Sequence, residues 1–152
     1  MKYAVSIEVD VSRERFVELF DNPENLYHWQ KGLKSFEHLS GDPGQPGAKS
    51  RLVFQMGKRE MVLIETITKQ DLPREFNGTY ETEGVFNIVQ NRFESVGPNR
   101  TRWTSENEFQ FSSWFMKVVG FLMKGAFPKQ TLKYLTDFKA FAESGKDVRN
   151  GV

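Results

Sequence analysis

A chain of 152 residues is long enough for one domain whose core buries about two-thirds of the surface of the unfolded chain. Its 21 lysines and arginines nearly balance 20 acidic residues, and the net charge of +1 lacks the basic footprint that indicates nucleic-acid binding. The absence of cysteine excludes disulfides, thiol catalysis and thiolate metal sites, and it is compatible with a reducing compartment.

The sequence carries no signal for secretion or membrane insertion. Residues 1–8 alternate apolar and polar side chains, without the continuous apolar run of a signal peptide. The 14 residues from Trp114 to Phe127 contain two lysines and fall short of the roughly 20 apolar residues that span a bilayer. We therefore expect a cytoplasmic protein without a transmembrane helix.

The chain begins with a strand followed by two short helices. Apolar residues alternate with polar ones from Tyr3 to Val11, as in a strand with one buried face. Ser12 is a good N-cap for a helix that runs to Phe20 with one apolar face. Pro23, which suits a first helical turn, starts a second short helix ending near Trp29.

The middle of the chain is patterned as strands. A strand over residues 33–40 leads through a loop rich in glycine and proline to a strand over 48–56. A two-residue turn at Gly57 and Lys58 would pair Phe54 with Met61 and Ser50 with Glu65. Since opposed residues share a face, Glu65 would then point inward with the apolar residues.

Another strand over 74–82 precedes a last hairpin. Strands over 85–95 and 101–111 would be joined by the loop 97–99. That register places Asn91 opposite Ser105 and Asn107 opposite Val89, with Phe93 opposite Trp103. The inner face of the hairpin is therefore part polar.

A long apolar helical segment follows the last strand. It is apolar nearly all round from Trp114 to Met123, and Pro128 interrupts it before apolar residues resume at helical spacing. We expect a kink or break near residues 125–128, because proline removes a helical hydrogen bond and clashes with the preceding turn. Residues 145–152 are expected to form a frayed tail.

The order of strand, two short helices, six strands and long C-terminal helix resembles the START-like superfamily, also called SRPBCC or helix-grip proteins, which includes polyketide cyclase/dehydrase-like members. The local resemblance lies in residues 28–33, 40–50 and 101–104, and the whole covers residues 1–143. It implies an α+β fold in which a seven-stranded curved antiparallel sheet grips the C-terminal helix, with one domain over residues 1–144. It also implies a cavity for a lipid, sterol, polyketide or similar apolar molecule, and it carries over no catalytic residue.

Several kinds of chemistry lack their residues in this sequence. No Gly-x-Ser-x-Gly elbow is present, and a catalytic triad would have to recruit His28 or His38. The same two histidines are too few for a typical zinc site, so we expect no metal and no cofactor. The phenylalanines sit mostly at apolar-face spacing, which indicates a core and not a nucleic-acid surface.

The candidate ligand-binding residues combine apolar and polar side chains expected on the inner face. They are Phe54, Glu65, Tyr80, Asn91, Trp103, Ser105, Asn107 and Phe109. An inward Glu65 would be desolvated and its pKa raised, which makes it a weak candidate for a general acid or base. If the strand phase is off by one residue, Glu65 is instead solvated. The two asparagines and the serine either orient the polar end of a ligand or satisfy one another.

Three hypotheses for function follow. The first is a non-catalytic protein that binds a small apolar ligand between the sheet and the last helix. The second is an enzyme of the aromatase/cyclase kind, in which Glu65 or Tyr80 moves protons. The third is a lipid-presenting module that docks to a membrane or a protein partner through the segment from Trp114 to Phe127, which requires that segment to expose apolar residues.

Overall fold

A computed structural model describes residues 1–150 of the chain. Seven strands form one antiparallel sheet in the order β1-β7-β6-β5-β4-β3-β2. The strands are β1 (Lys2–Val9), β2 (Leu33–Ser40), β3 (Lys49–Met56), β4 (Arg59–Asp71), β5 (Glu75–Thr82), β6 (Val85–Gly97) and β7 (Arg100–Phe111). The helices are α1 (Arg13–Phe20), the 3-10 turn η1 (Pro23–Asn25), α2 (Leu26–Trp29), α3 (Trp114–Leu122) and α4 (Ala126–Ser144). The expected α+β class, with seven antiparallel strands and a long last helix, is confirmed.

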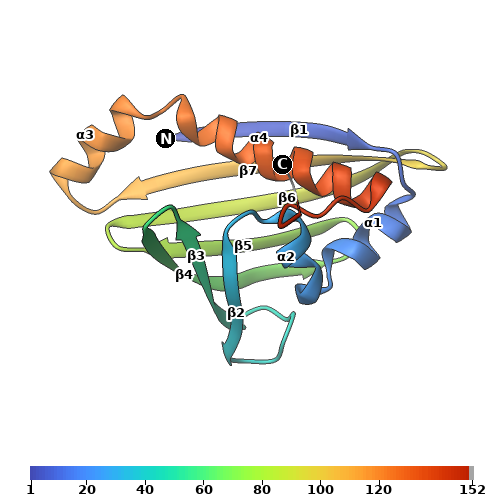
Figure 1. Cartoon of the computed structure of the whole chain (residues 1–152), viewed down its shortest axis with the longest axis horizontal. Helices are drawn as coiled ribbons and strands as arrows, with labels where there is room; N and C mark the ends of the chain where they lie inside the picture. The colour runs from blue at the N-terminus through green and yellow to red at the C-terminus, as the bar shows by residue number, and fades with distance from the viewer. Residues whose placement is uncertain (151–152) are drawn as a thin grey trace.

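The helices cover one face and both ends of the sheet. Figure 1 shows α4 lying along one face beside β1, with α1 and α3 at opposite ends of the molecule. Ser12 caps α1 as expected, because its hydroxyl accepts a hydrogen bond from the backbone N–H of Arg15 at 3.2 Å. The expected break before α4 is also confirmed, since α3 ends at Leu122 and Pro128 lies in the first turn of α4. Among the described helices, none is both long and apolar enough to cross a bilayer.

Both hairpin registers match those expected from the sequence. In the β3–β4 hairpin, Phe54 pairs with Met61 and Ser50 with Glu65. In the β6–β7 hairpin, Asn91 pairs with Ser105 and Val89 with Asn107. The face of each side chain therefore follows from turn position and alternation.

The buried apolar residues form two separate clusters. The larger one joins α1, α2 and α4 to the sheet, and its most buried aromatic residues are Phe16, Phe93 and Phe138. The apolar residues at helical spacing in α4 face the sheet, because Leu135 and Phe138 are buried and Tyr134, Phe141 and Ala142 pack beside them. A second, smaller cluster of Leu33, Leu52 and Phe54 lies under β2 and β3. Leu26 on α2 packs against both clusters.

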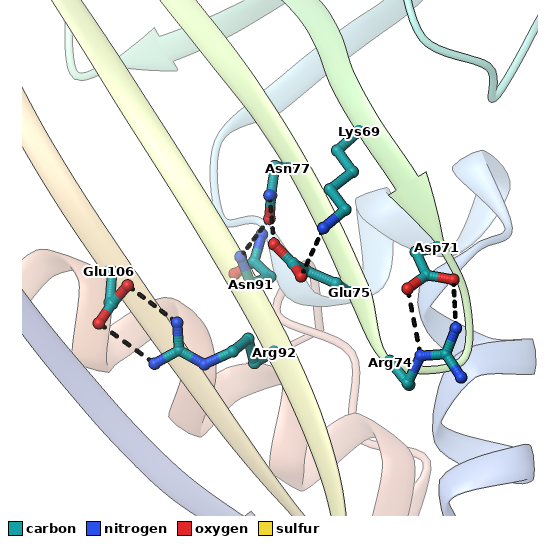
Figure 2. Close-up of polar contacts among 8 residues, drawn as sticks. All are labelled: Lys69, Asp71, Arg74, Glu75, Asn77, Asn91, Arg92 and Glu106. Carbon is teal, nitrogen blue, oxygen red and sulfur yellow. Dashed lines mark hydrogen bonds and ion pairs between the residues drawn. The ribbon is translucent and has the colours of Figure 1, made fainter.

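The outer face of the sheet, turned away from α4, is charged. Figure 2 shows the guanidinium of Arg92 bonded to both carboxylate oxygens of Glu106, at 2.9 and 3.1 Å, and Lys69 bonded to Glu75 at 3.1 Å. The hydrogen bonds from Arg92 lower the pKa of Glu106, which therefore stays ionised at neutral pH. Such exposed pairs add little stability. Their position shows instead which face of the sheet is solvated.

The C-terminal tail returns to α2. The Asp147 carboxylate lies 2.6 Å from His28 Nδ1, and the backbone N–H of Val148 donates to the His28 carbonyl at 3.0 Å. Hydrogen bonds from Arg149 are the main cause of a lowered Asp147 pKa. This differs from the frayed tail expected over residues 145–152, because an ionised carboxylate beside His28 and Arg149 holds this part of the chain; residues 151 and 152 lie outside the described residues.

Candidate functional site

Contacts to α4 identify the inner, concave face of the sheet. The Tyr3 hydroxyl on β1 lies 2.7 Å from Thr131 Oγ1 on α4, and the Trp103 ring on β7 packs edge-on against Phe138 with centroids 5.4 Å apart. From these points the register defines rows of inward residues across the sheet. One row runs Ile67, Gly78, Val89, Asn107 and Tyr3; the next runs Ser50, Glu65, Tyr80, Asn87 and Phe109.

Glu65 and Tyr80 form a hydrogen-bonded pair on this face. The Tyr80 hydroxyl donates to Glu65 Oε2 at 2.8 Å. Burial raises the pKa of Glu65, although the bond from Tyr80 opposes that shift. Burial also raises the pKa of Tyr80 well above its usual value, and the neighbouring Glu65 charge adds to this. Tyr80 is therefore a neutral donor, while Glu65 can accept a hydrogen bond or hold a proton.

Glu65 is the only acidic residue that the register places on the inner face of the seven strands within residues 1–150. The inward phase expected from the Gly57 turn is therefore the one observed. The solvated alternative, with Glu65 on the outer face, is wrong. A carboxylate whose environment raises its pKa is a recurrent feature of functional sites.

Asn87 belongs to the same row, and the sequence analysis missed it. Its Nδ2 donates to the Glu108 carbonyl at 3.2 Å and to Asn107 Oδ1 at 3.4 Å. The register that paired Val89 with Asn107 already implied that Asn87, two residues along, faces inward opposite Phe109. Alternation on β6 was thus the signal that could have found it.

A second polar group lies closer to the larger core cluster. Asn107 Nδ2 donates to Ser105 Oγ at 3.0 Å, and Trp103 Nε1 donates to Asn91 Oδ1 at 2.9 Å. All four side chains are buried. These hydrogen bonds agree with the second expectation for the two asparagines and the serine, that they bond to neighbouring protein groups and not to a ligand. Trp103 and Asn91 are also part of the packed core.

The other two candidates lie apart. Phe54 is buried in the second cluster with Leu33 and Leu52. Phe109 stacks between Tyr3 and Phe127, with centroids 6.1 and 4.7 Å away. The sequence-based candidates therefore divide among the packed core, the second cluster and the row around Glu65.

Between the two buried clusters the inner face stays partly accessible. Glu65, Tyr80, Asn87 and Val89, which we call the central strip, are half-buried and lie on adjacent strands. Gly78, which has no side chain, faces Val89 across β5 and β6, and a Cβ at this position would lie 3.0 Å from the Thr66 carbonyl oxygen. The central strip places three side chains that form hydrogen bonds beside one apolar residue, Val89. This mixture is the usual composition of a small-molecule site.

Two surface grooves lie outside the central strip. One of about 580 Å³ runs between the β3–β4 turn and α4, and Met56, Gly57, Lys133 and Tyr134 contribute to its walls. The other, of about 590 Å³, lies between the start of α1 and the β6–β7 turn. Neither groove is lined by Glu65 or Tyr80. We place the candidate site at the central strip because its polar groups converge and are shielded from bulk water. Residues 1–150 contain no cluster of three or more histidine, aspartate or glutamate side chains arranged to hold a metal ion.

Solved structures with the same architecture span almost the entire chain. Zhui aromatase/cyclase from Streptomyces sp. R1128 superposes with a TM-score of 0.78 at 12% identity, covering 100% of this chain and 99% of its own. Protein TTHA0849 from Thermus thermophilus has a TM-score of 0.77 at 14% identity, covering 95% and 99%. Ara h 8.0201 has a TM-score of 0.71 at 11% identity, covering 95% and 98%. The chain has the helix-grip fold of START-like proteins.

At these identities the helix-grip likeness establishes the fold alone. No protein-family model matches the sequence, and no curated protein sequence matches it. A helix-grip scaffold presents the concave face of its sheet to the last helix, and in this chain that face carries the central strip. Function has to be argued from those residues.

Proposed function

We propose that the protein binds a small, mainly apolar molecule carrying at least one polar group, held on the central strip between the sheet and α4. The supporting observation is the central strip itself, where Glu65, Tyr80 and Asn87 lie together on a half-buried part of the inner face. The cytoplasmic location remains part of this proposal and rests on the absence of cysteine.

The polar groups define what the ligand must offer. Tyr80 already donates to one Glu65 oxygen, so the other oxygen can accept a bond from a ligand hydroxyl. Asn87 has an amide oxygen that can accept a second bond. Val89 and Phe109 on the neighbouring positions would contact the apolar part. This chemistry suits a hydroxylated apolar molecule such as a lipid, sterol or polyketide.

The Glu65–Tyr80 pair also supports a second candidate function, an enzyme of the cyclase kind. The Glu65 carboxylate could accept a proton from a carbon beside a carbonyl. The Tyr80 hydroxyl, which donates to Glu65 before that transfer, could then turn to donate its hydrogen bond to the oxygen that gains charge. An aromatase/cyclase is among the proteins with this fold. The two candidates share one site and differ in whether the bound molecule is released unchanged.

Native mass spectrometry of freshly purified protein tests the proposal first. We expect a bound small molecule that is released unchanged on denaturation for the binder, and a converted product on incubation with an unsaturated polyketone for the enzyme. Protein that retains no small molecule, and binds no hydroxylated apolar compound in calorimetry, would contradict both functions.

Polar variants then test the location of the site. Glu65→Leu and Asn87→Leu remove the two proposed acceptors, so each should weaken binding of an oxygen-bearing apolar ligand about tenfold, as expected for one lost hydrogen bond. Tyr80→Phe should weaken binding less, because the Tyr80 hydroxyl bonds to Glu65. Gln90→Leu is the matched control, because Gln90 is exposed on the outer face of β6. Affinity that is unchanged in all three inner-face variants would place the site elsewhere on the molecule.

A further inference from the structure

We propose that α3 docks the protein onto an anionic membrane surface, with its exposed apolar face buried in the lipid interface and its lysines at the headgroups. This inference rests on α3 and the chain beside it, and it stands whether or not the central strip binds a ligand.

The outer face of α3 is apolar and exposed to an unusual degree. Trp114, Phe115, Phe121 and Leu122 expose 79, 67, 68 and 75% of their surface, and Val118 exposes 38%. At about 100° per residue these five positions fall within roughly one-third of the helix circumference, so they form one continuous face. Contiguous apolar surface of this kind marks an interaction site on a soluble domain.

The opposite face of α3 holds the helix on the sheet. Gly120 is buried, and a Cβ at this position would lie 2.6 Å from ring carbons of Phe111 at the end of β7. Met116 on the same side packs over Gly84 in the β5–β6 turn. The Ser113 hydroxyl caps the helix by accepting from the backbone N–H of Met116 at 3.1 Å. Because the inner face is anchored in this way, the exposed apolar face is presented outward, at the end of the molecule where Figure 1 shows α3.

Along the chain from Phe109 to Thr136, every charged side chain is a lysine. No acidic residue occurs between Glu108 and Asp137, whereas this interval contains Lys117, Lys124, Lys129 and Lys133. Within residues 1–150, Lys133 pairs with Asp137, while the other three ammonium groups have no carboxylate within ion-pair distance. Lys124 extends over the Phe121 ring, 4.9 Å from its centroid, which keeps its charge next to the apolar face.

This combination selects a membrane over other occupants. An apolar helix face with a tryptophan and flanking lysines is typical of helices that lie in the interface of anionic bilayers. A second copy docked face to face would bring Lys117 and Lys124 of both copies together, and like charges disfavour that contact. Glu83 is an exposed acidic residue in the β5–β6 turn, next to Gly84, on which Met116 of α3 packs.

Vesicle sedimentation with the full chain tests the proposal. We expect partitioning onto phosphatidylcholine vesicles containing about 30 mol % phosphatidylglycerol to exceed that onto pure phosphatidylcholine at least tenfold, and to weaken as salt is added. Tryptophan emission should shift to shorter wavelength on the anionic vesicles. That shift would report Trp114, since Trp29 and Trp103 are already buried.

Paired variants assign the binding to α3. Phe121→Ser with Leu122→Ser should lower the partition coefficient tenfold or more, whereas Leu39→Ser with Val62→Ser, which alters exposed apolar residues elsewhere, should not. Both pairs should keep the circular dichroism spectrum of the parent protein.

Charge variants test the anionic preference separately. Lys117→Gln with Lys124→Gln should reduce binding to the anionic vesicles about fivefold for each lysine. Lys58→Gln with Lys146→Gln, which removes the same charge from exposed positions elsewhere, should leave binding unchanged. Failure of the parent protein to sediment with either vesicle would overturn the proposal. So would equal binding to both vesicles, or a dimer in sedimentation velocity that only the α3 variants dissociate.

Discussion

Space beside Val89 is the feature on which the proposed ligand site depends, and Val89→Phe tests it directly. Val89 is half-buried on the inner face of β6, and its partner across the strand is Gly78, which has no side chain. A phenyl ring at position 89 can lie over Gly78, as aromatic residues do opposite glycine in sheets. If the strip is open, the added apolar contact offsets the lost side-chain entropy, and the free energy of unfolding should change by less than about 1 kcal/mol.

If the central strip is packed, Val89→Phe should change the free energy of unfolding by a larger amount. Inserting a larger side chain into a filled core costs about 1–3 kcal/mol, which for a domain of this length lowers the melting temperature by roughly 2–4 °C for each kcal/mol. Leu135→Phe provides that reference, because Leu135 exposes only 1% of its surface and lies in the larger cluster. Urea denaturation followed by tryptophan fluorescence gives both values.

Ligand binding supplies the second half of this test. Val89→Phe should abolish or strongly weaken binding of the co-purifying molecule, or of an anilinonaphthalene sulfonate probe, because the ring occupies the same space. Ile88→Phe, on the outer face of the same strand, should bind like the parent protein. A Val89→Phe protein that is destabilised as much as Leu135→Phe, or that binds normally, would refute the assignment of the site to the central strip.

Three further predictions concern the core, the buried carboxyl group and α3. Phe138→Ala should lower the free energy of unfolding by about 3–5 kcal/mol, since Phe138 is fully buried, while Leu132→Ala on the exposed side of α4 should change it by less than about 1 kcal/mol in the same denaturation series. Burial raises the pKa of Glu65 in the folded state above its value in the unfolded chain, which is about 4.3. At a pH between the folded and the unfolded pKa, the folded state therefore binds more protons than the unfolded state, and the free energy of unfolding falls as the pH rises through this range. Glu65→Gln removes this dependence, and its stability relative to the parent should therefore increase with pH; an NMR titration giving a normal or lowered pKa would contradict the expectation. Gly120→Ala should displace α3 and reduce its protection from proteolysis, because the new Cβ meets an aromatic ring at 2.6 Å, whereas Gly125→Ala has open space and should be tolerated.

Much of the fold could be predicted because its signals are local. Ser12 as a helix cap, Gly57 in a two-residue turn and Pro128 at a helix start each act through the geometry of a few neighbouring residues. Turn position and strict alternation then set the register, which correctly placed Glu65 inward and Asn91 opposite Ser105. These outcomes depend little on which distant segment packs against them.

Turn position and alternation could not predict how the side chains pack across the sheet. The sequence grouped Phe54 and Trp103 with Tyr80 as residues of one pocket, but Phe54 and Trp103 lie in two separate packed clusters and only Tyr80 lies on the central strip. Alternation assigns a side chain to a face, and it does not say whether a helix above that face fills the space. That is decided by where α1, α2 and α4 touch the sheet.

The sequence by itself therefore determined the order of the strands along the chain, the faces of the side chains in the two hairpins, and the apolar character of the segment from Trp114 to Leu122. The tertiary structure alone decided that this segment is exposed, because the seating of Gly120 on Phe111 turns its apolar face outward. It also decided that the tail docks through Asp147 onto His28, 119 residues apart along the chain. Contacts of this kind depend on distances between elements, which no local pattern of residues encodes.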